Sequence, residues 1–132
     1  MSNLPVYTAA LRSAHVQATI AKTVFTDASN TVQLSTAGAA GSIFKRVTAS
    51  SRATLGANMV CMLYKSSNSG GTLFEVASAI ITAGARDATH GAPAIDFGYT
   101  TAAPLRLGVG ETLYVAIGAA GTVDFVAEGE DF

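Results

Sequence analysis

The residues from Glu111 to Phe132 constrain the fold of this chain more than any other segment. Apolar side chains alternate there with polar or small ones in two stretches, which are separated by a short Ala-Gly segment. The alternating apolar positions are Leu113, Val115 and Ile117, followed by Val123, Phe125 and Ala127. This period of two predicts two strands joined as a β-hairpin, with these side chains on the buried faces.

Similar short segments recur along the chain, separated by turn-forming residues. The other predicted strands cover residues 15–20, 24–25, 31–35, 43–49, 58–65, 72–82, 95–99 and 105–107. Residues 58–65 are apolar on both faces, which predicts a central strand, whereas residues 72–82 also fit a helix, although their apolar residues favour a strand. We therefore expect a single all-β domain over residues 15–132, an antiparallel β-sandwich of the jelly-roll type.

The first residues differ from the rest. Residues 1–14 lack a clear hydrophobic period and contain Pro5. We expect them to form an extended N-terminal arm that orders only against a neighbouring molecule.

Composition narrows the possible partners. Charged residues make up only 13% of the chain, and Ala, Thr, Ser and Gly make up nearly half, which suits a surface that other subunits cover. The net charge of −1 predicts no general attraction to nucleic acid. No apolar run approaches the roughly 20 residues that span a bilayer, and no signal-peptide pattern is present at the start. We expect a protein made and kept in a reducing, soluble compartment.

Charge is unevenly distributed along the chain. Residues 1–65 contain most of the basic residues, and residues 66–132 contain most of the acidic ones. Either strands from the two halves interleave, so that the asymmetry disappears in three dimensions, or the molecule has two ends that attract opposite surfaces.

Residues that could carry chemistry are few. Cys61 lies in an apolar run and is expected to be a small core residue. His15 and His90 have no nucleophile motif around them, and the acidic residues at the chain end lack the spacing of a calcium loop. We predict no catalytic residue, no metal site and no cofactor.

Three stretches together carry a resemblance to a known group of proteins. They are Thr36–Ser42 leading into a strand, Phe74–Ala83 before a Gly- and Pro-rich loop, and Leu107–Leu113 followed later by Val126–Phe132. Their order resembles small virion proteins of tailed bacteriophages and prophages, which typically end in A-x-G-G-D-F/Y. This chain has Glu130 at the position of the second glycine.

The resemblance implies a capsid decoration (cement) protein, a small β-sandwich that is usually a homotrimer. Such a protein is made in the host cytoplasm and binds the major capsid protein on the outer surface of the virion. Tyr7, Leu11 and Arg12 of the arm are the predicted shell contacts. The alternative is a tail, neck or fibre-associated virion β-sandwich with a host-binding role. A carbohydrate-binding or hydrolytic sandwich is a third hypothesis, weakened by the absence of Trp and the scarcity of other aromatic residues.

Overall fold

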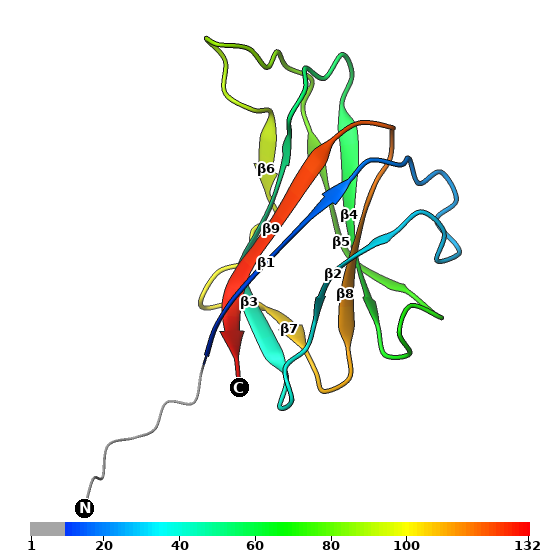
Figure 1. Cartoon of the computed structure of the whole chain (residues 1–132), viewed down its shortest axis with the longest axis vertical. Helices are drawn as coiled ribbons and strands as arrows, with labels where there is room; N and C mark the ends of the chain where they lie inside the picture. The colour runs from blue at the N-terminus through cyan, green and yellow to red at the C-terminus, as the bar shows by residue number, and fades with distance from the viewer. Residues whose placement is uncertain (1–9) are drawn as a thin grey trace, which may run out of the picture.

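Residues 10–132 are described by the computed structural model, and they form nine β-strands and no helix (Figure 1). The strands are β1 (Ala10–Ala18), β2 (Val32–Thr36), β3 (Ser42–Ser51), β4 (Met59–Ser66), β5 (Phe74–Ile81), β6 (Ala94–Asp96), β7 (Leu105–Leu107), β8 (Thr112–Ile117) and β9 (Val123–Asp131). No segment between residues 10 and 132 is a helix that could span a bilayer.

The strands assemble into two antiparallel sheets that pack together. Sheet A has the order β1-β9-β3-β6, with β7 also paired to β3, and sheet B has the order β2-β8-β4-β5. The predicted all-β class and antiparallel β-sandwich are confirmed.

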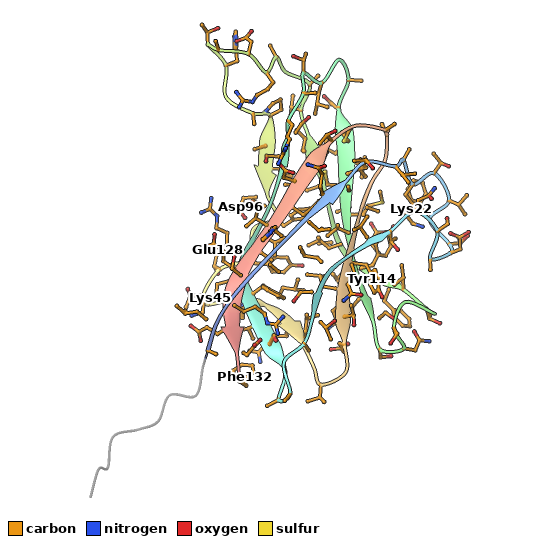
Figure 2. The ribbon with its side chains drawn as sticks, in the orientation of Figure 1. Lys22, Lys45, Asp96, Tyr114, Glu128 and Phe132 are labelled. Carbon is orange, nitrogen blue, oxygen red and sulfur yellow. The ribbon has the colours of Figure 1, made fainter. Side chains whose placement is uncertain are left out.

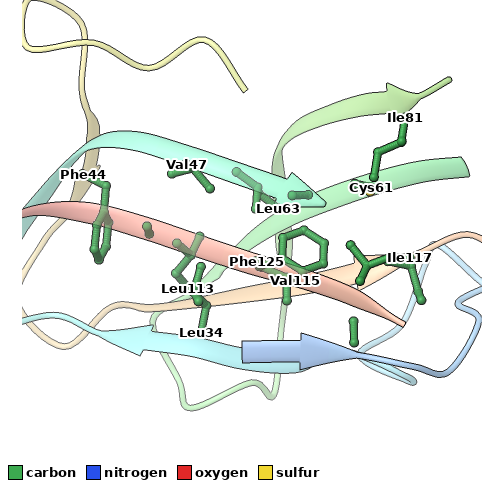
Figure 3. Packing of buried hydrophobic residues seen from close by; sticks show 14 of the residues in the cluster. Leu34, Phe44, Val47, Cys61, Leu63, Ile81, Leu113, Val115, Ile117 and Phe125 are labelled. Carbon is green, nitrogen blue, oxygen red and sulfur yellow. The ribbon is translucent and has the colours of Figure 1, made fainter. Parts of the chain in front are cut away.

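The core lies between the sheets and is formed by alternate residues of their strands (Figure 3). Phe44 and Val47 of β3 and Phe125 of β9 contribute from sheet A, and Leu63 of β4 and Leu113 of β8 contribute from sheet B. All five side chains are fully buried. Each buried side chain of this size stabilises the fold by roughly 1.5–3 kcal/mol relative to an exposed one.

Two of the strand predictions are confirmed in detail. β4 lies between β8 and β5, so the segment with two apolar faces is an interior strand. The segment 72–82, which also fitted a helix, forms strand β5, because its backbone pairs with β4 from Met59–Ile81 to Lys65–Phe74.

The predicted boundary between arm and sandwich requires a correction. β1 begins at Ala10, so residues 10–14 belong to sheet A and not to an arm. The physical reason is the partner strand: β9 pairs with β1 in unbroken register from Ala10–Asp131 to Ala18–Val123. Backbone hydrogen bonds to β9 therefore hold a segment that has little hydrophobic periodicity of its own. The arm expected over residues 1–9 lies outside the described residues and stays a prediction.

The closing hairpin is the second correction. β8 belongs to sheet B and β9 belongs to sheet A, so the Ala-Gly segment crosses between the sheets and does not join paired strands. The faces were predicted correctly, since the six alternating apolar side chains are all fully buried. Both strands point these side chains into the same core from opposite sides.

The third correction concerns Val24 and Phe25, which were expected in a short strand. They lie in the long connection between β1 and β2, outside any strand. Both side chains are exposed, Phe25 by 57%. The segment forms turns instead of a strand, because the Asp27 carboxylate accepts hydrogen bonds from the backbone N–H and the hydroxyl of Ser29.

Candidate functional site

The three predicted shell contacts differ in their exposure and in their contacts within the molecule. Tyr7 lies outside the described residues. Leu11 lies on β1 and is 91% exposed. Arg12 follows it on the same strand but is engaged within the molecule, so its side chain is already occupied in the isolated chain.

Arg12 holds the end of the sandwich together. Its Nε donates to Asp131 Oδ1 at 2.5 Å, and one terminal nitrogen donates to Ser35 Oγ at 2.7 Å. Ser42 Oγ also donates to Asp131 Oδ1, at 2.5 Å. The Arg12 hydrogen bond, followed by that of Ser42, lowers the pKa of Asp131 below its ordinary value. The cluster links three strands of sheet A to β2 of sheet B.

The acidic residues near the chain end lack the spacing of a calcium loop, and the structure shows what they contact. They lie on β9, where Glu130 pairs with Lys45 and Asp131 binds Arg12. Within residues 10–132 no group of His, Cys, Asp and Glu is arranged to hold a metal ion.

The charge asymmetry of the sequence is resolved by interleaving of the two halves. Five ion pairs each join a basic residue of the first half to an acidic residue of the second: Arg12–Asp131, Lys45–Glu130, Arg46–Asp96, Arg52–Asp124 and Lys65–Glu111. The strand order places β3 beside β9 and β6, which brings most of these partners together. The alternative of two oppositely charged ends is not supported.

The reactive side chains lie apart. His15 lies on β1 beside a depression of about 380 Å³, and His90 lines a different one of about 420 Å³. His90 Nδ1 is 2.8 Å from Asp87 Oδ1 in an exposed loop. Cys61 is buried as expected, and burial raises the pKa of its thiol to about 12. The thiol therefore stays protonated at neutral pH.

Three exposed apolar side chains lie at one end of the sandwich, which we call the terminal end: Leu11, Val109 and Phe132. Leu11 is on β1 near its pairing with the last residues of β9, and Val109 is in the turn after β7, which pairs with the start of β3. Phe132 donates its backbone N–H to the Gly41 carbonyl at 3.1 Å in the turn before β3. The end of the chain lies here, and β1 begins here as well (Figures 1 and 2).

The outer face of sheet A carries several ion pairs. Its charged groups pair along the surface, as in Arg52–Asp124 at 2.7 Å and Arg46–Asp96 at 3.7 Å. The hydrogen bond from Arg52, with a smaller contribution from Gln17, lowers the pKa of Asp124 below its ordinary value. This face remains open to solvent.

The outer face of sheet B carries a second apolar layer. Met62 and Tyr64 of β4 and Ala116 of β8 are buried there, with Leu73 and Tyr114 packed against them. This small cluster is separate from the main core, because alternate residues of β4 point to opposite sides of the sheet.

Lys22 secures the connection between β1 and β2 against this layer. Its side chain is fully buried, and its ammonium group donates to the backbone oxygens of Asp27 at 2.8 Å and Ser29 at 2.7 Å. The ammonium also lies 5.8 Å from the centre of the Tyr64 ring. Its backbone N–H donates to the Ile117 carbonyl at the end of β8. Residues 19–31 are thereby fixed as a strap beside sheet B (Figure 2).

The strap and β5 hold the exposed apolar residues that sequence reasoning missed. Ile20, Val24 and Phe25 are exposed on the strap, and Phe74, Val76 and Ile80 are exposed on β5. The available signal was the apolar pair Val24–Phe25 between polar residues, which fits an exposed loop as well as a short strand. No family model, curated protein or solved structure matches this chain.

Proposed function

We propose that this protein is a capsid decoration protein that binds the major capsid protein on the outer surface of a bacteriophage virion and stabilises the shell. The observation that carries the proposal is the terminal end, where Leu11, Val109 and Phe132 expose apolar surface near the start of β1. Clustered exposed apolar side chains on a small domain mark sites of protein association.

The strand order supports a further part of the proposal, a jelly-roll topology. With β7 set aside, β9 lies between β1 and β3, and β8 lies between β2 and β4. The last two strands thus insert between earlier ones in the two facing sheets, as expected for two Greek keys in a jelly roll. A homotrimer is the assembly that we propose on the basis of the resemblance.

The proposed shell contact combines Tyr7, in the residues that precede β1, with Leu11 on β1. Arg12 has a different role in this proposal: its ion pair with Asp131 keeps the start of β1 paired with β9. Repeated over many copies, modest contacts of this kind sum to firm binding of the shell.

The test mixes purified protein with empty capsid shells and measures the protein that sediments with them. We expect Leu11→Asp or Val109→Asp, or deletion of residues 2–9, to weaken binding by roughly tenfold or more, because each removes an apolar contact. Thr48→Asp on the outer face of sheet A is the matched control, since it adds the same charge away from the terminal end. Equal loss in the control, or no loss in the three variants, would contradict the proposed contact.

The alternative location, in a tail, neck or fibre, is separated by counting labelled copies in each virion. A shell protein is present in hundreds of copies, whereas a tail or neck protein is present in a handful. A handful of copies would replace the decoration role by this alternative.

A further inference from the structure

Strand β5 differs from the other outer strands of the sandwich. Within the described part of the chain, β6 and β7 have three residues each, β2 has five, and β1 carries Arg12 and His15. β5 has eight residues and, among the nine described strands, pairs only with β4. Its other edge therefore offers a row of backbone donors and acceptors.

The side chains of β5 do not protect this edge. The strand contains no Lys, Arg or Pro, and its one charged residue is Glu75. Phe74 is 63% exposed and Ile80 is 54% exposed. Natural proteins usually guard long edge strands with charges, proline or short length, so an apolar edge of this length is expected to be covered by another strand.

The sequence of β5 indicates which strand covers it. Residues 76–80 are Val-Ala-Ser-Ala-Ile. In either direction this segment has a β-branched apolar residue at each end, then alanine, with serine in the middle. We propose that β5 pairs antiparallel with β5 of a second copy of this chain, around a twofold axis at Ser78. This contact does not depend on the proposed capsid function.

The twofold register matches side chains on both sides of the sheet. Val76 of one copy lies opposite Ile80 of the other, and Ala77 lies opposite Ala79. Cross-strand pairs of β-branched residues stabilise a sheet. The register shift of β5 beside Val76 limits this regular pairing to residues 76–80, so the two Glu75 side chains lie outside the paired segment.

The area of contact predicts its strength. Eight strand residues are about 27 Å long and the two sheets lie about 10 Å apart, so the open side presents on the order of a few hundred Å². That is less than the roughly 800 Å² per partner of a standard interface. We therefore expect a concentration-dependent dimer, and a stronger one wherever copies are held side by side.

Disulfide trapping tests the register. In the proposed pairing the two Ser78 residues lie opposite each other, within the Cα separation that a disulfide needs. Ser78→Cys should form a covalent dimer in oxidised glutathione roughly tenfold faster than Ser13→Cys, an exposed position on β1. The native Cys61 is buried and contributes little. Equal rates for the two variants would overturn the proposal.

Sedimentation over a concentration series tests the contact without a crosslink. The mass should approach twice the 13.4 kDa of one chain, or rise from three copies to six if a trimer forms through another surface. Ile80→Lys should abolish the concentration-dependent step, whereas Leu11→Lys, the same change on β1, should retain it. Thermal melting confirms that both variants are folded.

Two further outcomes decide the identity of the covering strand. A chain that shows no concentration-dependent association overturns the second-copy contact. Protection of β5 amides from hydrogen exchange only on capsid shells also overturns it and assigns the edge to a shell strand. Shell binding by Ile80→Lys measures the capsid function separately, so failure of one proposal does not imply failure of the other.

Discussion

The two outer faces of this sandwich are built from the same alternating strands, yet they differ in what covers them. The outer face of sheet A carries charged groups that pair along the surface. The outer face of sheet B has a second apolar layer around Tyr64, held beneath a strap by the buried Lys22. On sheet B, the connection between β1 and β2 is held against this second layer.

The difference shows that a connection can become part of a core. The β1–β2 connection supplies polar backbone groups, and a buried lysine satisfies two of them. A charged side chain in such a place needs hydrogen bonds to offset its desolvation. The strap therefore depends on Lys22 more than an ordinary surface loop depends on any of its lysines.

The largest expected effect on stability tests whether the second apolar layer of sheet B contributes to folding as a hydrophobic core does. Tyr64→Ala should lower the free energy of unfolding by about 3–5 kcal/mol, because it removes a buried aromatic ring. Tyr64→Phe is the control and should change it by less than about 1 kcal/mol, since the hydroxyl donates a weak hydrogen bond to the sulfur of Met62 at 3.2 Å. Urea denaturation measures both. A loss in Tyr64→Ala no larger than that of a surface variant would refute the layer.

The next effect tests the close approach of the β9 and β3 backbones at Gly129 in sheet A. A Cβ at Gly129 would collide with the Ile43 carbonyl and lie 2.7 Å from Phe44 Cα, at the register shift between β9 and β3. Backbone must move to accept it, so Gly129→Ala should destabilise the fold by about 3 kcal/mol. Gly56→Ala, where nothing lies within 4 Å, should have almost no effect in the same denaturation experiment. Similar results for the two alanines would contradict this close approach.

A smaller effect concerns the strap itself. Lys22→Met keeps the length of the side chain but leaves two backbone oxygens without their donor, so it should cost about 2 kcal/mol. Lys65→Met is matched, because Lys65 also donates to a carbonyl oxygen, that of Arg106, but its side chain is one-quarter exposed. Water can replace that donor, so a loss of only about 0.5 kcal/mol is expected. Hydrogen exchange of residues 19–31 should increase in Lys22→Met alone; unchanged exchange would show that Lys22 does not hold the strap.

The smallest effect belongs to the open face of sheet A. Arg52→Gln should reduce stability by about 0.5 kcal/mol, and high salt should reduce this difference, because the pair with Asp124 is exposed. The pKa of folded Asp124 is lowered from 3.8, so its contribution is present above pH 3.8 and is lost as the pH falls through the folded value.

Arg52→Gln should therefore also flatten the dependence of stability on pH below 3.8. Denaturation at several pH values measures this slope. A slope equal to that of the original chain would show that Arg52 does not set the pKa of Asp124.

The local sequence predicted the strands and their buried faces well. The six alternating apolar residues that the sequence places on β8 and β9 are all fully buried in the core. The two apolar faces of β4 correctly predicted that it is an interior strand. Such patterns are local, because side chains on a strand alternate between two sides whatever the strand pairs with.

The site was predicted less well. Leu11 was predicted as a shell contact, and it is exposed. Arg12 was predicted as a shell contact too, but it binds Asp131, which is far along the chain and adjacent only after β1 pairs with β9. The strap and the edge of β5 were missed, because exposure depends on what other segments cover. An apolar residue in a loop and one in a strand look alike until their neighbours are known.

By itself the sequence determined that short strands with alternating faces would bury a shared apolar layer. Only the tertiary structure decided that β8 and β9 lie in opposite sheets, that β1 starts at Ala10, and that Lys22 is buried. The physical reason is that alternation sets which side of a strand is apolar, whereas the choice of partner depends on backbone hydrogen bonds between distant segments. Those bonds form in the same way with many sequences, so the sequence pattern of one strand does not identify its neighbour.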